Sequence, residues 1–590
     1  MKDKVSQLWT WIKPFKGAFI LALLLTTVLS FIGMIPPLLM RRLVNNVAKE
    51  GEWNLFPLIM VVLIAIPILR SGINLVHAFA VNKVGIGLLG SMRKRLYAHL
   101  MRLSMDFYEE TPPGNINQRL VGDVGAVSGF VTGGLVNLVA DVVSVVFALI
   151  VMFRISPLLL GLSLFLLPLY VLNYFFFSRR IAETNVTLRN HMDHISSFLQ
   201  ERLSAHELMR SYGQEKPQST HFNSQSKQIM DNALRSGAYN AAFSHIGAFI
   251  NRIGNTTIFC AGCYLLIRGR MGYGDVMAFG AYTTSLLGPL VRFSTVANQF
   301  RQVGVSVDRI NQVLHKKPGI TEASDPVPLT GLQGDIKFSE VDFRHGEPEP
   351  ALDNVSLEIP AGSSVAVAGL PGAGRTTLAL LLRRFYDPTD GTISVDNVDI
   401  KKYKLHDYRK SLALVLPESA IFDGTIRENM LYGAPGAGDE RMREIAHLLS
   451  LDEFTEELRD GYETRVGSGG LRLPAGICQK IGIARALLSD PDVLITDEAT
   501  SRLDGDSAEA VISAILEAME DRTCLMVVNR VLHARETDSV VVLQNGSVQE
   551  IGEHETLLRK QEGHYRYLFE QQYGQQAPPL DSTETTNETG

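Results

Sequence analysis

The chain has 590 residues, more than one hydrophobic core normally organises, so a single-domain protein is excluded. Hydrophobic residues make up 46% of it and its formal net charge is −6; we expect no nucleic acid among its partners. The hydrophobic content averages an apolar part, before about Gln299, and a more polar part after it.

The first part contains six apolar runs suited to crossing a bilayer, since each crossing needs roughly 20 residues. They are Phe15 to Leu39, Leu55 to Phe79, Phe130 to Phe153, Leu158 to Phe177, Ala242 to Ile267 and Val276 to Leu290, the last extending towards Val296. The pattern predicts an α-helical membrane bundle of six spans.

Cations gather before the first run, after the second and after the fourth, and the positive-inside rule places these groups in the cytoplasm. They are Lys2, Lys4, Lys13, Lys16, Arg93, Lys94, Arg95, Arg102, Arg179, Arg180 and Arg202. An even number of spans then puts both termini in the cytoplasm, which indicates a multi-pass protein of the cytoplasmic (inner) membrane. The first run is too long for a cleavable signal peptide.

Four cysteines fit a reduced cytoplasm or a membrane interior better than a secreted disulfide framework. The CAGC sequence from Cys260 to Cys263 matches a redox pair superficially, but it lies inside a predicted membrane helix among small residues. Packing is therefore the preferred interpretation of this pair.

Two loops on the inner side, residues 83–125 and 179–238, are helix-rich and longer than connectors need. They predict membrane helices that continue into the cytoplasm and reverse near Met105 to Val124 and near His206 to Lys216. We assign residues 1–316 to the membrane domain with these coupling loops and 317–334 to a linker. Residues 335–570 then form a nucleotide-binding domain, and 571–590 a disordered tail.

The segment VAVAGLPGAGRTT, from Val365 to Thr377, has the build of a phosphate-binding loop. Its backbone N–H groups can surround phosphate oxygens, the following helix adds its positive dipole end, and a hydroxyl can reach Mg²⁺. The nucleotide-binding candidates are Gly369, Leu370, Pro371, Gly372, Ala373, Gly374, Arg375, Thr376 and Thr377, with Thr376 also a metal candidate.

A second apolar segment, PDVLITDEAT, ends in two carboxylates. At the end of a strand, Asp497 is suited to holding Mg²⁺, directly or through water, and Glu498 to polarising the attacking water. The phosphate loop and the strand-end acids together predict an ATP site far more specifically than either does alone.

With these motifs the chain resembles a half-transporter of the ATP-binding cassette superfamily, over nearly its whole length. SRLD at Ser501 to Asp504 resembles the D-loop of that family, IGIARALLSDP the helix after its signature, and TPPGNINQRLVGDV its first coupling-helix region. The resemblance implies an exporter-type membrane bundle fused to an α/β P-loop cassette. It also implies ATP and Mg²⁺ as cofactors, with ATP held between the phosphate loop of one cassette and the signature of another, and Asp504 nearby.

Several positions depart from the family pattern. Arg375 replaces the lysine of the phosphate loop, and its planar fork does not fit a cradle shaped for an ammonium. His345 stands where an aromatic ring usually stacks on adenine. Glu418 stands where a glutamine normally senses the magnesium site, and Asn529 occupies the position of the switch histidine. We treat Glu498, Asn529 and Glu418 as the catalytic candidates, and Thr376, Glu418 and Asp497 as the metal candidates.

The signature is altered most, because LPAGI aligns with LSGGQ of the family. Proline removes a hydroxyl and a backbone N–H, while alanine adds a methyl group, so we expect a persistent helix with a weaker anion site. The residues concerned are Leu473, Pro474, Ala475, Gly476 and Ile477.

In a homodimer both ATP sites would combine an altered loop with an altered signature, so hydrolysis would be slow. We therefore predict a heterodimer with a second half-transporter, the alternative being a homodimer that needs only slow turnover. Polar residues within the predicted spans suggest a small amphipathic substrate, such as a lipid, peptide, drug or siderophore, moved between the faces of the lipid bilayer. The alternatives are a siderophore importer built on the exporter fold and a nucleotide-regulated membrane protein that transports nothing.

Those intramembrane polar candidates are Arg70, Asn74, His77, Asp141, His245, Asn251, Arg252 and Asn255. The preferred interpretation of two of them is a structural pair between Asp141 and Arg252, with contact to substrate as the alternative.

Overall fold

A computed structural model of the chain describes residues 8–346 and 349–574. Its contacts divide into two compact units. The first comprises residues up to Met101 and from Pro113 to Lys316, and the second comprises Arg102–Pro112 and the chain from Lys317 onward.

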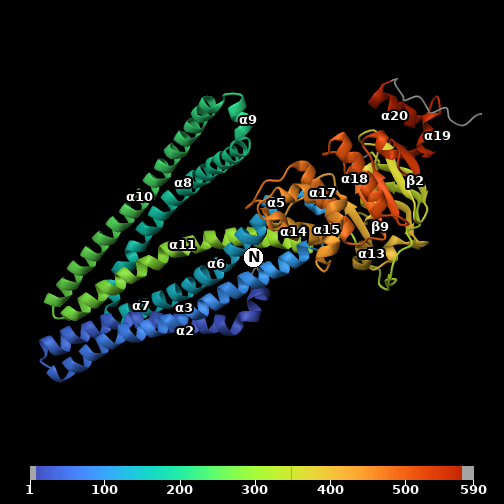
Figure 1. Cartoon of the computed structure of the whole chain (residues 1–590). Coiled ribbons are helices and arrows are strands. Elements are labelled where there is room, and N and C mark those ends of the chain that lie inside the picture. Colours follow the sequence, from blue (N-terminus) through green and yellow to red (C-terminus); the bar gives the residue numbers. More distant parts are fainter. Residues whose placement is uncertain (1–7, 347–348, 575–590) are drawn as a thin grey trace, which may run out of the picture. The chain divides into compact units, whose positions relative to one another are not determined.

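The first unit is helical (Figure 1). Its long helices are α2 (Lys16–Arg42), α3 (Phe56–Leu100), α7 (Val136–Ile155), α8 (Pro157–Ser204), α10 (Glu215–Ile267) and α11 (Tyr273–His315). Shorter helical segments are η1 (Lys13–Phe15), η2 (Leu43–Lys49), η3 (Trp53–Leu55), α5 (Pro113–Asn117), η4 (Gln118–Asp123), α6 (Val124–Gly129), η5 (Phe130–Leu135) and α9 (His206–Ser211).

Four helical segments of the described chain are long and apolar enough to cross a membrane, by length and composition alone. They are Leu8–Lys49, Trp53–Leu100, Pro113–Ile155 and Pro157–Ser204, and they contain the first four predicted spans. The fifth and sixth predicted spans lie within the continuous helices α10 and α11. Helix α11 packs against α2 and α7, so it belongs to the same bundle.

Helices α8 and α10 form a long antiparallel hairpin that is closed by α9, at the reversal predicted around His206 (Figure 1). Polar side chains of α8 bond to the backbone of α10: the Tyr170 hydroxyl donates to the Gly247 carbonyl at 2.8 Å, and the Asn173 amide donates to the Phe243 carbonyl at 3.2 Å. Helices α3, α8 and α10 therefore continue without a break from the predicted spans into the predicted coupling loops.

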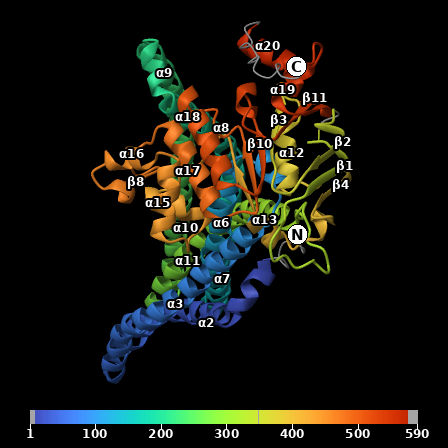
Figure 2. The same cartoon turned by 45° about the vertical axis from the view of Figure 1, so that its right-hand side comes forward.

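The second unit is built mainly on two large sheets (Figure 2). The larger has the strand order β12-β11-β3-β10-β9-β6, in which neighbouring strands are parallel except at the β12 edge. The smaller, β2-β1-β4-β5, is antiparallel and packs with α12 and the inner strands in one hydrophobic core. A two-stranded sheet joins β7 and β8.

The strands are β1 (Ile336–Phe343), β2 (Leu352–Ile359), β3 (Ser364–Gly369), β4 (Asp390–Val395), β5 (Val398–Asp399), β6 (Leu412–Val415), β7 (Gly424–Thr425), β8 (Arg465–Val466), β9 (Val493–Asp497), β10 (Thr523–Val527), β11 (Ser539–Gln544) and β12 (Ser547–Gly552). The helices are α4 (Met105–Glu110), α12 (Arg375–Leu382), α13 (Leu405–Ser411), α14 (Ile426–Met430), α15 (Asp439–Leu448), α16 (Asp452–Glu456), α17 (Ala475–Leu488), α18 (Gly505–Ala518), α19 (His554–Leu558) and α20 (His564–Tyr573), with 3₁₀ turns η6 (Ile400–Lys402), η7 (Leu431–Gly433), η8 (Gly461–Glu463) and η9 (Val531–Ala534).

Strands β9 and β10 are buried at every position, as expected for parallel strands covered on both faces. Because parallel strands share a direction, the carboxyl ends of β3, β9 and β10 meet at one edge of the sheet. The loops that follow these three strands can therefore assemble a site there.

Helix α4 packs with the second unit, although it belongs to a loop assigned by sequence to the membrane domain. Phe107 is buried, and the Tyr386 hydroxyl donates to a Glu109 carboxylate oxygen at 2.6 Å. Helix α4 directly precedes TPPGNINQRLVGDV, the segment that resembles the first coupling-helix region of the family.

Helix α20 continues through Tyr573, so the first residues of the predicted disordered tail are helical. Residues 575–590 of that predicted tail lie outside the described residues.

Candidate functional site

The phosphate loop connects β3 to α12 and has the backbone that its glycines allow. Gly372 and Gly374 have φ of +83° and +97°, in the region that favours glycine. A Cβ on Gly374 would lie 2.5 Å from the Ala351 carbonyl oxygen, so a side chain is excluded there. The predicted loop residues from Gly369 to Thr377 thus form one strand-loop-helix turn.

Arg375, the first residue of α12, points into the protein rather than towards solvent. Its side chain is only 7% exposed. One guanidinium nitrogen donates to the Val528 carbonyl after β10, and another forms a 3.1 Å ion pair with Glu498. The cation predicted to bind phosphate is therefore engaged by the carboxylate predicted to polarise water.

Thr376 and Asp497 come together as predicted for a magnesium site. The Thr376 hydroxyl donates to one Asp497 carboxylate oxygen at 3.2 Å, while the other oxygen is buried without a hydrogen-bond partner. Burial raises the pKa of Asp497, opposed by the Thr376 hydrogen bond and reinforced by the nearby Glu498 charge.

This donor set fits Mg²⁺, a hard cation bound through one or two protein oxygens with waters and phosphates completing its shell. No group of three or more His, Cys, Asp or Glu side chains with metal-binding geometry occurs among the described residues. Magnesium held with a nucleotide needs no such group. When bound, it would neutralise phosphate charge, and Thr376 and Asp497 would position it.

Glu498 follows β9 with φ of +49°, a left-handed conformation uncommon for a residue with a side chain. Its backbone N–H donates to the Val527 carbonyl at 3.0 Å, which fixes the turn against β10. Strained backbone of this kind often occurs at functional positions. The turn places the carboxylate beside the start of α12.

His345 lies two residues after the end of β1, in a small aromatic group. Its ring meets Phe343 and Tyr386 edge-on, with centroids 4.7 and 5.2 Å away, and its Nε2 lies 3.4 Å from the Thr377 hydroxyl. The residue is exposed, so its ring remains available for stacking.

Two other candidates do not join the Thr376 and Asp497 pair through any contact between described residues. The Glu418 carboxylate is exposed and ion-paired with Arg502, a partner that the sequence analysis did not identify. Asn529 is exposed just after β10, and its backbone carbonyl accepts from Gln572 at 2.8 Å. Arg502 is the second residue of the SRLD match to the D-loop, and spacing alone gave no signal that it pairs with Glu418.

The altered signature still starts a helix, as predicted. Pro474 is the N-cap of α17, and its carbonyl accepts the first helical hydrogen bond, from the Cys478 N–H at 3.0 Å. Leu473 precedes it, while Ala475, Gly476 and Ile477 form the first turn.

Asp504 caps α18. Its carboxylate accepts from the Ser507 backbone N–H at 2.9 Å and from the Ser507 hydroxyl at 3.0 Å. These bonds hold the pKa of Asp504 below its usual value. The structure thus gives this residue a local helix-capping role.

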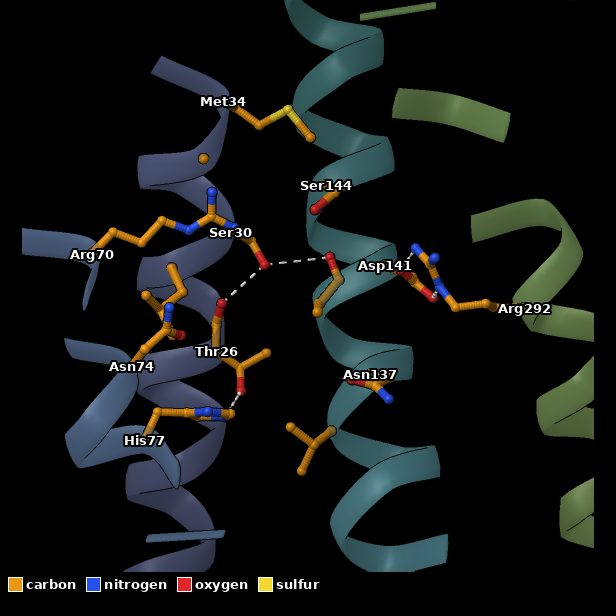
Figure 3. A pocket seen from close by; sticks show the side chains of 14 residues that line it. Thr26, Ser30, Met34, Arg70, Asn74, His77, Asn137, Asp141, Ser144 and Arg292 are labelled. Carbon is orange, nitrogen blue, oxygen red and sulfur yellow. Dashed lines mark hydrogen bonds and ion pairs between the residues drawn. The ribbon is translucent and has the colours of Figure 1, made fainter. Parts of the chain in front are cut away.

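In the membrane unit, four of the predicted polar residues line one cavity: Arg70, Asn74, His77 and Asp141 (Figure 3). The proposed pairing of Asp141 with Arg252 is wrong, because Asp141 is bonded to Arg292 of α11 by both carboxylate oxygens. Sequence could not rank the two arginines, since only the packing of α7 against α11 selects one. The candidates on α10 do not line this cavity, and Asn255 donates to Asn251 at 2.6 Å.

A bundle of membrane helices joined in one chain to an α/β domain with a phosphate loop and strand-end acids defines a membrane transporter with its own nucleotide-binding domain. The chain belongs to the ABC transporter family. Residues 19–290 match the model of the ABC transporter transmembrane region, and residues 352–501 match the ABC transporter model. It is thus an exporter-type half-transporter, and its ATP-binding domain implies ATP binding and hydrolysis.

Relatives match along nearly the whole chain. A Bacillus subtilis protein named "Putative multidrug export ATP-binding/permease protein YgaD" is 30% identical, covering 95% of this chain and 97% of that protein. The B. subtilis ABC transporter ATP-binding protein YknV is 29% identical over 96% and 95% of the two chains. A solved bacterial Atm1-family ABC exporter with ATP bound has the same fold, with a TM-score of 0.78, 23% identity and coverage of 96% and 99%.

Proposed function

We propose that this chain is one half of an ATP-driven exporter that moves an amphipathic solute across the cytoplasmic membrane, with both termini in the cytoplasm. The supporting observation is that one chain joins a membrane bundle with a polar cavity to an ATP-binding domain. ATP acts as a ligand with different affinities for two conformations, and closure of two cassettes on ATP turns the cavity outward. The name of the relative YgaD, which refers to multidrug export, is consistent with this direction.

We propose further that the ATP site of this chain hydrolyses ATP slowly. The ion pair between Arg375 and Glu498 supports it, because the water-polarising carboxylate must leave the guanidinium before it can act on an attacking water. Asn529 and the Pro474 substitution each remove a further donor or proton carrier. Such a chain functions best in a heterodimer whose partner has an intact phosphate loop and signature.

Reconstitution in lipid vesicles tests both parts. We expect the purified chain alone to hydrolyse ATP slowly, and its co-purified complex with a half-transporter of consensus motifs to hydrolyse it at least about tenfold faster. Robust turnover by the isolated chain would reject the heterodimer. Flux of solute into inside-out vesicles supports export, and flux the other way would instead establish an importer. ATP binding without flux in either direction would leave a nucleotide-regulated, non-transporting protein.

A further inference from the structure

A polar cavity lies within the membrane bundle, between α2, α3, α7 and α11 (Figure 3). Its volume is about 540 Å³, which is sufficient for a small organic molecule. Charged and amide groups line it, and they lie within the predicted membrane spans, where apolar side chains are the rule. Such groups are expensive in a membrane, so their concentration in one cavity requires an explanation.

One carboxylate and one guanidinium in the cavity neutralise each other. Asp141 is 7% exposed, and its two oxygens accept from the Arg292 Nε at 2.8 Å and from a terminal nitrogen at 2.5 Å. This two-point geometry is the strong form of an ion pair. The Asp141 charge is therefore neutralised by Arg292, and both of its oxygens have a partner.

Arg70 of α3 is a second guanidinium, and it has no ion pair or hydrogen bond within the part of the chain that the structure describes. It extends across to α2, where its guanidinium carbon lies 3.6 Å from the place of a Cβ on Gly33. The Arg70 head therefore lies against α2 beside the cavity (Figure 3). The cavity therefore carries a positive charge that no group among the described residues compensates.

Neutral hydrogen-bonding groups surround that charge. Asn74 and Asn137 line the cavity with amides, and Ser144 adds a hydroxyl. The His77 Nε2 is hydrogen-bonded to the Thr26 hydroxyl at 2.8 Å, so α2 and α3 hold this ring in place. Amide N–H and hydroxyl groups, together with a guanidinium, are the donors that bind carboxylate or phosphate oxygens.

We propose that this cavity binds the anionic head, a carboxylate or a phosphate, of an amphipathic molecule, with Arg70 as its charge partner. Because Asp141 neutralises Arg292, Arg70 is the cation of this cavity that is left to bind the anion. This assignment rests on the proposed transport function and names the class of its substrate. The head comes either from a solute or from a bilayer lipid, and the two sources present the same chemistry.

Binding of radiolabelled octyl phosphate to the full-length protein in phosphatidylcholine nanodiscs tests the assignment, with empty discs as background. We expect Arg70→Met to weaken binding at least about tenfold, the loss of one charge-assisted contact. Arg70→Lys should recover part of it. Arg252→Met, a matched change on α10 outside the cavity, should bind as the parent protein does. Octyltrimethylammonium should not compete.

A second variant moves binding in the opposite direction. Asp141→Asn removes the partner of Arg292, whose side chain is half exposed, and should tighten octyl phosphate binding several-fold because a second guanidinium is released. A general structural role for these residues would not produce opposite effects from Arg70→Met and Asp141→Asn. If Asp141→Asn does not fold, the comparison of Arg70→Met with Arg252→Met still tests whether the cavity binds the anion through Arg70.

Phosphatidylglycerol added to the discs separates the two sources. Competition with octyl phosphate identifies a lipid head as the natural occupant, and lack of competition identifies a solute; both outcomes support the anionic site. The inference is overturned if Arg70→Met and Arg252→Met bind alike, or if octyltrimethylammonium binds as tightly as octyl phosphate. Arg70-dependent binding without ATP-driven flux would reject the proposed transport but not the site.

Discussion

The membrane cavity and the ATP site each contain one arginine-carboxylate pair, but the buried partner differs. In the cavity the carboxylate is enclosed, with Asp141 7% exposed and Arg292 53% exposed. In the cassette the cation is enclosed, with Arg375 7% exposed and Glu498 25% exposed. The more deeply buried charge is thus the carboxylate in the cavity and the cation in the cassette.

This difference assigns different roles to the two pairs. Asp141 needs Arg292, because an unpaired charge in a low-dielectric interior is strongly unfavourable. Arg375 keeps the Val528 carbonyl as a second acceptor, so Glu498 can separate from it without leaving the cation unsatisfied. The first pair is therefore a fixed part of the cavity, and the second is suited to opening during turnover. Four substitutions test this contrast.

Glu498→Gln should have the largest effect. The amide keeps the size of the side chain but cannot polarise water, so ATP hydrolysis at the site built on this phosphate loop should fall roughly 100- to 10,000-fold. ATP binding, measured by equilibrium dialysis, should persist. Glu517→Gln, on the exposed face of α18, serves as a matched control and should hydrolyse ATP at the parental rate. Unchanged single-turnover hydrolysis in Glu498→Gln would contradict the assigned role.

Arg292→Met should destabilise the membrane unit by about 3–5 kcal/mol, because it leaves the buried Asp141 charge without its partner. Thermal unfolding of the purified protein in nanodiscs measures the effect. The double variant Arg292→Met with Asp141→Asn should recover most of the loss, since no buried charge remains. Equal midpoints for the single and double variants would show that the pair contributes no specific coupling.

Arg375→Lys should raise ATP turnover about tenfold, which corresponds to roughly 1.4 kcal/mol at the transition state. An ammonium suits the phosphate cradle and has no planar fork to bridge Val528 and Glu498, so the carboxylate becomes available. The comparison uses steady-state turnover of the same complex with either residue. Lower turnover in the lysine variant would indicate that Arg375 contributes directly to catalysis.

Asp497→Asn should have the smallest effect of the four substitutions. It should raise the stability of the folded state slightly. The raised pKa of Asp497 means that this group favours the folded state below the usual aspartate range and loses that contribution as the pH rises through the folded pKa. At neutral pH the amide should therefore raise the unfolding midpoint of the nucleotide-free protein. The difference from the parent should shrink near about pH 4. A lower midpoint at neutral pH would refute this electrostatic account.

Much of the fold follows from local patterns in the sequence. The long apolar runs required membrane helices, and the reversal near His206 was visible because the helix-rich loop contains a turn signal there. The phosphate loop was recognisable because its glycines are needed for backbone with positive φ and for close approach to Ala351. The persistence of α17 after Pro474 followed from the tolerance of helix N-termini for proline.

Partners far apart in the chain were not predictable in the same way. The sequence supplied the residue types: arginines and an aspartate within membrane spans, and an arginine in place of the loop lysine. Only the packing of α7 with α11 decided that Asp141 pairs with Arg292, and only the meeting of β9, β10 and α12 brought Arg375 to Glu498. Local motifs depend on neighbouring residues and are written in the sequence, whereas ion pairs across more than 100 residues depend on how whole elements pack.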